Sequence, residues 1–254
     1  MLPQKKIATV ILTKNAASQI ENCLQSVYGW ADEIIIVDGQ STDPTLEICK
    51  KYTDKVFIHP FQGSFSEDRN FGADQAKSEW ILQLDADEIV PKDFKEKFET
   101  IRNTPRHSAY KTFRKNHFLG RCMKTWNHQI QILYLKSKAR FHGHVHERLD
   151  IQGSVGTLPT HIEHYPFQTL HQWLERHNRY TGLFAKELFE THGILPWKKV
   201  RRNLYYKPFK TIWKLYIIKR GYRDGWHGFI FSVLYGLEHF LKWAKYWELT
   251  RHAK

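Results

Sequence analysis

The chain has 254 residues, 41% of them hydrophobic, which is enough for one large α/β domain or a domain with an extension. Its net charge of +13 is uneven, because residues 1–100 contain 11 Lys and Arg against 17 Asp and Glu while residues 101–254 contain 28 against 9. Three cysteines and the lack of an apolar signal region argue against a disulfide framework, so we expect reduced thiols in a cytoplasmic protein.

The first hundred residues alternate short apolar runs with helical patterns. Strands are predicted over residues 6–13, 33–37 and 56–59 and from Trp80 onward, and helices over residues 18–28, 45–52 and 65–76. Ser18 followed by Glu21 has the spacing of a capping box at the start of the first helix. Strands that alternate with short helices in this way predict right-handed βαβ units and a parallel sheet.

The patterns beyond Pro91 are weaker and turn helical towards the C-terminus. We predict a helix over residues 94–101, strands over 109–113, 129–135 and 139–141, a hairpin or loop over 151–161, and helices near 170–191, 197–219 and 225–249. The predicted fold class is α/β, a mostly parallel sheet flanked by helices with a C-terminal helical extension. We expect a domain over residues 1–165, divided into halves 1–100 and 101–165, and an extension over residues 166–254.

The C-terminal segment is basic and rich in aromatic residues. Residues 195–254 contain 14 Lys and Arg against 3 Asp and Glu. Its most apolar run, residues 226–241, includes His227, Glu238 and His239 and is shorter than the roughly 18–20 clean residues of a spanning helix. Two readings stay open: the helices pack on the domain with a solvated basic face, or they make a peripheral contact with a membrane.

The apolar run that begins at Trp80 ends abruptly in three carboxylates, Asp85, Asp87 and Glu88. A short apolar run is typical of a strand that is buried on both faces of a parallel sheet, and such sheets bind ligands at the C-terminal ends of their strands. In an extended segment Asp85 and Asp87 point to the same side, where Mg²⁺ or Mn²⁺ could bind between them. The alternative is a solvated acidic turn.

Polar residues also follow two other predicted strands. Thr13 and Asn15 follow the first strand and Asp38 follows the second, and Arg69 lies on the helix before the acidic strand end. A nucleotide would fit there, although ordinary turn chemistry explains Asn15 and Asp38 equally well. The chain has neither a Gly-x-Gly-x-x-Gly fingerprint nor a Gly-Lys-Ser/Thr loop, so a metal on the aspartate pair is the remaining way to hold a diphosphate.

These motifs together resemble those of a known family. Thr-Lys-Asn (13–15), Val-Asp-Gly-Gln-Ser-Thr-Asp (37–43), Asp-Arg-Asn (68–70) and Trp-Ile-Leu-Gln-Leu-Asp-Ala-Asp-Glu (80–88) look like the GT-A fold of family 2 glycosyltransferases. The resemblance covers about residues 5–100 and implies an inverting enzyme that uses a nucleotide-diphosphate sugar. Phe-His-Gly-His-Val-His-Glu (141–147) and Arg-Asp-Gly-Trp-His-Gly (223–228) are similar to lipopolysaccharide-core β-1,4-glucosyltransferases that act on inner-core heptose.

The resemblance implies a role for each matching residue. Thr13, Asn15 and Asp38 would line the nucleoside pocket with Arg69 beside it. Asp87 would coordinate Mg²⁺ or Mn²⁺, Asp85 would hold the ribose or a metal-bound water, and Glu147 would be the catalytic base. Two departures from the pattern, Ala16 after Asn15 and Gln-Ile-Leu at residues 131–133, affect the donor pocket and the acceptor contacts.

Two further constellations stay open. His142, His144 and His146 are spaced by two, so they could bind zinc, lie beside the acceptor, or supply His144 or His146 as a third ligand of the donor metal. Trp126 with Arg114 could form an acceptor-binding loop, since aromatic rings stack on sugars and Arg pairs with phosphate. The alternative for Trp126 is a hydrophobic anchor.

The sequence therefore predicts a metal-dependent hexosyltransferase. The expected donor is a UDP-sugar, most simply UDP-glucose, and the expected acceptor is an anionic glycolipid, the lipopolysaccharide core. The enzyme would act in the cytoplasm, with peripheral contact at the cytoplasmic face of the inner membrane as an open option. Alternatives are a peptide or another glycan as acceptor, nucleotidyl transfer, and nucleic-acid binding, for which the chain carries no recognisable motif.

Overall fold

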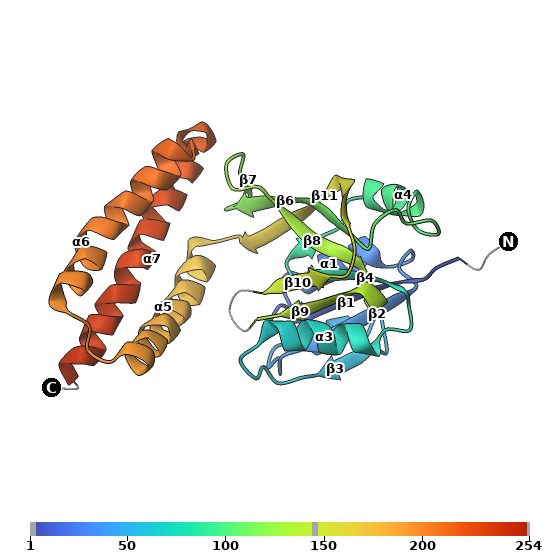
Figure 1. Ribbon diagram of the computed structural model, residues 1–254, viewed down its shortest axis with the longest axis horizontal. Helices are drawn as coiled ribbons and strands as arrows, with labels where there is room; N and C mark the ends of the chain where they lie inside the picture. The colour runs from blue at the N-terminus through green and yellow to red at the C-terminus, as the bar shows by residue number, and fades with distance from the viewer. Residues whose placement is uncertain (1–3, 144–146, 253–254) are drawn as a thin grey trace. The chain divides into compact units, whose positions relative to one another are not determined.

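The computed structural model describes residues 4–143 and 147–252 and divides the chain into two compact units (Figure 1). The first unit holds residues 1–115 and 128–164, and the second holds residues 116–127 and 165–254. The sequence-based division lay between residues 165 and 166, so it did not separate residues 116–127, which belong with the C-terminal helices. Each unit is described by itself below.

The first unit is built on a mixed sheet whose N-terminal strands are parallel (Figure 1). Its strands follow one another in space as β3 (Val56–Ile58), β2 (Glu33–Asp38), β1 (Ile7–Thr13), β4 (Trp80–Asp85), β8 (His128–Leu135), β6 (Ala109–Phe118), β11 (Val155–Phe167) and β5 (Glu88–Ile89). Pairing is parallel from β3 to β4 and antiparallel between β4 and β8, β8 and β6, and β11 and β5. The predicted α/β fold, a mostly parallel sheet flanked by helices, is confirmed, and its parallel pairs lie in the N-terminal half of the sheet.

Apolar side chains cover both faces of β1, as its continuous apolar run predicted. Ile7 and Ile11 point into the core on one face, and Ala8 and Val10 into the core on the other. The helices of this unit are α1 (Ile20–Val27), α2 (Thr45–Cys49), α3 (Phe65–Gln75) and α4 (Asp93–Glu99). α3 packs against the strands at Gly72, where an added Cβ would lie 2.4 Å from Cγ1 of Val10.

Two local predictions differ from the structure. α1 begins at Ile20 with Gln19 as its N-cap and no side-chain cap, so the capping box expected from Ser18 is wrong. Residues 151–161 were expected to form a hairpin or loop around two glycines, but β11 starts at Val155 and runs for 13 residues. Gly153 has a φ of +122° and makes the turn before the strand, whereas Gly156 lets β11 approach His107 closely, since a Cβ there would lie 2.4 Å from that ring.

A separate antiparallel hairpin packs on α3. It consists of β9 (Ala139–His142) and β10 (Arg148–Ile151), which follow the 3₁₀ turn η1 (Lys136–Lys138). Phe141 packs in one hydrophobic cluster with Ala73 and Ala76 around α3. The hairpin matters for function because Glu147 lies in the connection between its two strands, directly before β10.

The second unit is helical, as the sequence predicted. Its elements are β7 (Arg121–Cys122), which pairs with the end of β6, and α5 (Leu170–His192), α6 (Trp197–Trp213), η2 (Lys214–Ile218), η3 (Gly221–Asp224) and α7 (Gly225–His252). α7 packs against both α5 and α6, and Trp243 and Tyr246 of α7 are buried with Ala185 and Val200. Among the described residues, none of these helices combines the length and the apolar character that crossing a bilayer requires.

Candidate active site

The C-terminal ends of three strands meet at one edge of the sheet. Thr13 lies opposite Asp38 in the β1–β2 pairing, and Leu12 lies opposite Asp85 in the β1–β4 pairing. The residues predicted to line a donor site are therefore neighbours in space, at the edge where α/β sheets bind ligands. Their roles remain predictions, because proximity alone assigns no ligand.

Turn hydrogen bonds organise the part of this edge assigned to the nucleoside. The carboxylate of Asp38 is fully buried and accepts hydrogen bonds from N and Oγ of Ser41, at 2.8 and 2.6 Å. Asn15 has a φ of +50° and accepts a hydrogen bond of 2.8 Å from N of Thr42. Oγ1 of Thr13 is buried without a hydrogen-bond partner among the described residues. The turn chemistry that was the alternative for Asn15 and Asp38 is therefore present.

Asp85 and Asp87 do not lie in one extended segment. β4 ends at Asp85, and Ala86 with Asp87 forms a turn before β5. The expectation that both carboxylates point to one side of a strand is therefore wrong. Oδ1 of Asp85 lies 3.0 Å from Nη2 of Arg69, whereas Oδ1 of Asp87 lies 3.4 Å from Nε2 of His164. The antiparallel pairing of β11 with β5 brings His164 there, since it lies opposite Glu88.

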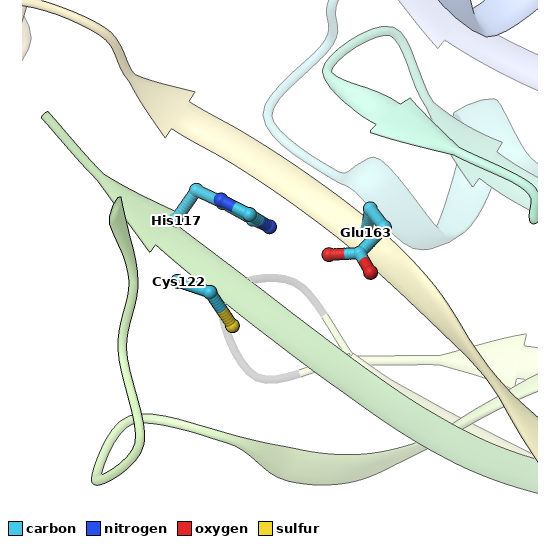
Figure 2. Close-up of side chains that lie close together, drawn as sticks. All are labelled: His117, Cys122 and Glu163. Carbon is cyan, nitrogen blue, oxygen red and sulfur yellow. The ribbon is translucent and has the colours of Figure 1, made fainter. Parts of the chain in front are cut away.

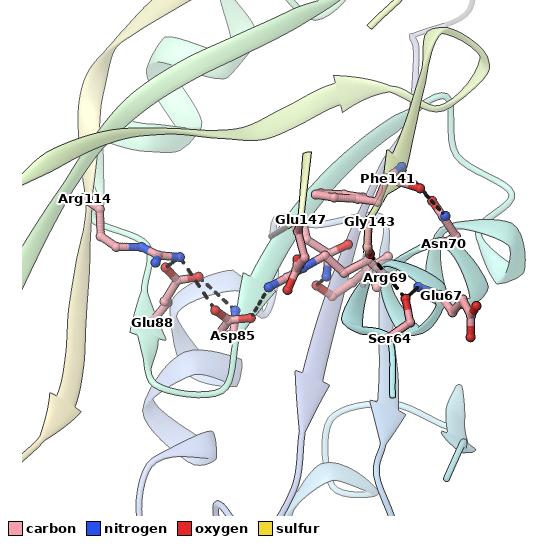
Figure 3. Close-up of polar contacts among 12 residues, drawn as sticks. Ser64, Glu67, Arg69, Asn70, Asp85, Glu88, Arg114, Phe141, Gly143 and Glu147 are labelled. Carbon is pink, nitrogen blue, oxygen red and sulfur yellow. Dashed lines mark hydrogen bonds and ion pairs between the residues drawn. The ribbon is translucent and has the colours of Figure 1, made fainter. Parts of the chain in front are cut away.

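Two half-buried arginines link the carboxylates of the site, as Figure 3 shows. Arg69 donates from Nη2 to Asp85 and from Nε to Glu147, so it bridges an aspartate of the turn and the predicted base. Arg114 pairs with Glu88 and lies 3.7 Å from Oδ2 of Asp85. Arg114 was assigned to the acceptor, but its guanidinium is engaged with the carboxylates at the end of β4.

Burial and these arginines set the pKa values of the carboxylates in opposite directions. Burial raises the pKa of Asp85, but Arg69 and Arg114 outweigh it and hold that pKa below its ordinary value. Burial raises the pKa of Glu88 to about 6, and the charge of Asp85 adds to the effect while Arg114 opposes it. Burial lowers the pKa of Arg69, but Asp85 and Glu147 dominate and raise it. The site thus keeps charged groups paired in a desolvated place, which is typical of functional sites.

A cleft of about 970 Å³ opens over this network. Arg69, Asp85, Arg114 and Glu147 line it together with Gln129 of β8 and Arg148 of β10. Pockets that bind small molecules have roughly this size, and a sugar with part of a diphosphate would fit. Glu147 keeps 22% of its side chain exposed here, so its carboxylate can be reached from the cleft.

α3 holds the hairpin that leads to Glu147 (Figure 3). The side chain of Asn70 donates to the carbonyl of Phe141 at 2.9 Å and accepts from its N–H at 3.0 Å. Arg140 makes a bidentate ion pair with Asp74, at 2.6 and 2.8 Å. Arg69 and Asn70, which are neighbours in the Asp-Arg-Asn motif, therefore both bind the hairpin that contains Glu147. Arg69 binds the carboxylate of Glu147, and Asn70 binds the backbone of Phe141.

Comparison with known proteins identifies the family. Residues 9–158, more than half of the chain, match the family described as glycosyl transferase family 2. The chain belongs to this family. An uncharacterized glycosyltransferase of Rickettsia bellii is 30% identical to it over 264 aligned positions, which cover 97% of this chain and 87% of that protein. The lipopolysaccharide core biosynthesis glycosyltransferase LpsC of Rhizobium meliloti is 25% identical over 265 positions, covering 100% of this chain and 95% of LpsC.

The GT-A fold that the motifs implied is confirmed for this glycosyltransferase by its family membership and by the sheet described above. Among solved structures, residues 1–349 of S. aureus TarS in complex with UDP-GlcNAc align with a TM-score of 0.49. The sequence identity is 14%, and the alignment covers 98% of this chain and 91% of that one.

The residues beside the turn fit a divalent cation. The described residues there include four carboxylates, Asp85, Asp87, Glu88 and Glu147, and carboxylate oxygens are ligands that Mg²⁺ and Mn²⁺ prefer. Oδ1 of Asp87 and Nε2 of His164 lie 3.4 Å apart. Adjacent ligands of an ion that binds at about 2.0–2.1 Å lie about 3 Å apart, so both atoms could bind one Mg²⁺ or Mn²⁺. Sequence reasoning did not single out His164.

Of the three histidines that the sequence analysis singled out, His142 lies within the described residues and the other two do not. His144 and His146 lie outside the described residues, so both the zinc site and the third-ligand option remain predictions. His142 is 63% exposed and its Nε2 lies 3.9 Å from Asp150. This distance corresponds to a loose surface pair rather than a coordinating cluster.

Trp126 belongs to the helical unit of the glycosyltransferase. Its ring lies 4.7 Å from that of Phe231 and 6.4 Å from that of Tyr235, both on α7. These contacts are those of the hydrophobic anchor that was its alternative, and its role in acceptor binding stays a prediction. The same segment contains the short β6–β7 pairing, in which His117 lies opposite Cys122 (Figure 2).

The second motif of the narrower resemblance shapes the turn into α7. The carboxylate of Asp224 is fully buried and accepts hydrogen bonds from N of Lys124 and from N and Oγ1 of Thr125. An added Cβ on Gly228 would lie 1.9 Å from the carbonyl oxygen of Gly221, so only glycine fits. Asp224 and Gly228 therefore have structural roles, whereas the Trp226 between them is 77% exposed.

Proposed function

We propose that this glycosyltransferase moves a hexose, glucose in the simplest case, from a UDP-sugar to an inner-core heptose of lipopolysaccharide or a similar envelope glycan, with inversion. One observation carries the proposal. Arg69 holds Asp85 and Glu147 together in a cleft beside the turn that bears Asp87, so a donor site and a base share one cavity. Inverting transfer needs a base across the reacting carbon from the leaving diphosphate.

On the donor side, the proposal assigns the nucleoside to the strand ends. Thr13, Asn15 and Asp38 would contact the base and ribose, and the buried hydroxyl of Thr13 supports this because it has no other described partner. Arg69 would stand beside the diphosphate, where its guanidinium offers donors to phosphate oxygens.

Asp87 and His164 would hold a Mg²⁺ or Mn²⁺ ion, with Asp85 nearby to bind the ribose or a metal-bound water. When bound, such an ion acts as a Lewis acid that stabilises the charge of the leaving diphosphate. The chain's own contribution is to keep His164 and Asp87 together through the pairing of β5 with β11.

Glu147 would accept the proton of the acceptor hydroxyl as that oxygen attacks the anomeric carbon. A positioned base of this kind is typically worth about 10²–10⁴ in rate. Arg69 orients Glu147 by donating to one of its carboxylate oxygens, which leaves the other oxygen for the proton. Release of the diphosphate and protonation of Glu147 then belong to one displacement.

An anionic glycolipid is the acceptor that we propose. The full-length similarity to LpsC, whose name places it in lipopolysaccharide core biosynthesis, supports this class, as does the charge of residues 101–254. Such an acceptor lies in a membrane, so the proposal places the enzyme at the cytoplasmic face of the inner membrane, with peripheral contact through the basic tail. A panel of glycolipid, soluble glycan and peptide acceptors would separate this choice from the alternatives.

The decisive experiment is a calorimetric titration of UDP into the full chain, with and without Mg²⁺ or Mn²⁺. We expect metal-dependent binding in the wild type and its loss in Asp87→Asn, because the amide lacks the charge that holds the ion. Asp54→Asn, which changes an exposed aspartate remote from the sheet edge, is the matched control and should bind like the wild type. UDP binding that is equal in both variants would remove the metal role of Asp87.

A further inference from the structure

Helix α6 exposes a face that carries basic side chains in its N-terminal half and aromatic side chains towards its C-terminal end. Lys198, Arg202, Tyr205, Phe209 and Trp213 are spaced by three or four residues, so they lie along one side of the helix. Tyr205, Phe209 and Trp213 are 63, 72 and 61% exposed. The opposite side is buried, as Val200, Asn203 and Pro208 show. We call Lys198, Arg202, Tyr205, Phe209 and Trp213 the basic aromatic face.

The segment of the chain that carries this face has charges of a single sign. Residues 191–223 contain ten Lys and Arg and no Asp or Glu. The N-terminal part of α6 also has a hollow of about 680 Å³, lined by Lys198, Lys199, Arg201, Arg202, Tyr205 and Tyr206. Four cations and two phenol groups around one hollow suit phosphate groups. A segment whose charged side chains are all Lys and Arg repels a basic partner and attracts an anionic one.

A second group of aromatic residues lies around the turn between η2 and α7. The ring of Tyr216 lies 6.4 Å from that of Tyr222 and 5.7 Å from that of Phe229, whose ring lies 6.0 Å from that of Trp226. Trp226 is 77% exposed although its neighbours Asp224 and Gly228 anchor the turn. A rigid turn that exposes an indole ring leaves apolar surface in contact with water, which is unfavourable. A partner that covers the ring of Trp226 would remove this unfavourable contact.

We propose that the basic aromatic face of α6 and the aromatic turn before α7 form a docking surface for an anionic lipid bilayer. Tyr and Trp side chains favour the headgroup region, and an amphipathic helix with Lys and Arg on its polar side lies in the plane of that region. Each Lys or Arg close to an anionic surface strengthens binding roughly fivefold. The surface lies within the helical unit. The inference rests on the proposed function in one respect, because it specifies which residues make the membrane contact assigned there to the basic C-terminal helices, and it does not depend on the donor chemistry.

Co-sedimentation of the full chain with vesicles tests the electrostatic part. Vesicles of phosphatidylcholine alone are compared with an equal mixture of phosphatidylcholine and phosphatidylglycerol, at low and high salt. We expect salt-sensitive binding to the mixed vesicles only, and a loss on the order of 100-fold when Lys198, Arg201 and Arg202 are all replaced by Gln. The matched control replaces the exposed Lys50, Lys51 and Lys95 by Gln, removes the same charge and should bind like the wild type.

A second variant tests the apolar part. Phe209→Ser with Trp213→Ser should weaken binding to mixed vesicles about tenfold and leave its salt sensitivity, because the apolar contribution is lost while the cations remain. Tyr28→Ser, at an equally exposed tyrosine of the first unit, is its control. Circular dichroism verifies that each variant is folded. Absence of wild-type binding to mixed vesicles would overturn the proposal in favour of a soluble partner, and equal binding of the two triple variants would overturn the assigned surface.

Discussion

At the scale of single residues, the candidate site depends on side chains that satisfy two demands at once. Arg69 forms an ion pair with Asp85 and another with Glu147, so one guanidinium compensates the charge of the aspartate and also orients the proposed base. The neighbouring residue Asn70 makes no contact with these carboxylates. Its side-chain amide instead donates to and accepts from the backbone of Phe141, in the hairpin that contains Glu147. We infer that Asn70 positions the base rather than contacting substrate.

Replacing Asn70 by Ala should free the hairpin. Both hydrogen bonds to Phe141 are lost, and a buried backbone group without a partner costs about 1–3 kcal/mol. We expect faster hydrogen exchange at the Phe141 amide, reduced sugar transfer and unchanged affinity for UDP. Asn22→Ala, at an exposed position of α1, is the control. Reduced UDP affinity in Asn70→Ala would indicate general damage to the fold and contradict a positioning role.

At the scale of elements, the position of α3 decides where Arg69 and Asn70 act. The helix approaches β1 and β2 closely because Gly72 has no side chain, and a Cβ there would lie 2.4 Å from Val10 and 2.7 Å from Val37. The neighbouring motif residues consequently reach the strand ends on one side and the hairpin on the other. A glycine in the middle of a helix has an entropic cost, which this close packing offsets.

Gly72→Ala should therefore destabilise the protein although alanine is the better helix former. Overpacking of a core typically costs about 1–3 kcal/mol, which exceeds the gain of about 1 kcal/mol in helix propensity. Gly182→Ala in α5 is the matched control, because the nearest atom to its added Cβ, Nζ of Lys245, is 3.9 Å away. We expect this control to be neutral or stabilised in urea unfolding. If both substitutions stabilised the chain, the close contact of α3 would be wrong.

At the scale of the whole molecule, charge and acid response differ between the parts of the chain. The acidic residues of the first hundred lie largely in the unit that contains the cleft, whereas the helical unit is basic and contains two histidines with lowered pKa values. Burial is the main cause for His177, which stacks on Trp173 with ring centroids 3.8 Å apart, and for His239. Both must gain a proton on unfolding in acid.

The helical unit should accordingly lose stability below neutral pH. A histidine whose folded pKa is below its unfolded value of about 6.5 contributes stability above that pH, and the contribution is lost as the pH falls, by at most about 1.4 kcal/mol per pH unit. Urea unfolding at about pH 7.5 and about pH 5.5 measures the loss. We expect it to be smaller in His177→Gln than in the wild type, and unchanged in the control His171→Gln, at an exposed position. Equal losses in all three proteins would show that His177 does not cause the acid response.

Local patterns in the sequence were sufficient for the strands of the N-terminal, parallel half of the sheet and for the residues at their ends. The buried runs of β1, β2 and β4 are continuous, and Thr13, Asp38 and Asp85 follow them directly, so parallel pairing brings them to one edge without further information. The helices of the C-terminal unit were also predicted, since their apolar periodicity extends over many turns. In each case neighbouring residues carry the signal.

Contacts between distant segments decided the rest. His164 reaches Asp87 only because β11 pairs with β5, and Arg114 meets Glu88 across strands that are separated in the chain, so no local spacing could assign either residue. The sequence by itself determined the family, the parallel half of the sheet and the acidic strand end. Only the tertiary structure decided which cation faces which carboxylate, because the pairing of strands and the burial that shifts each pKa depend on residues far apart in the chain.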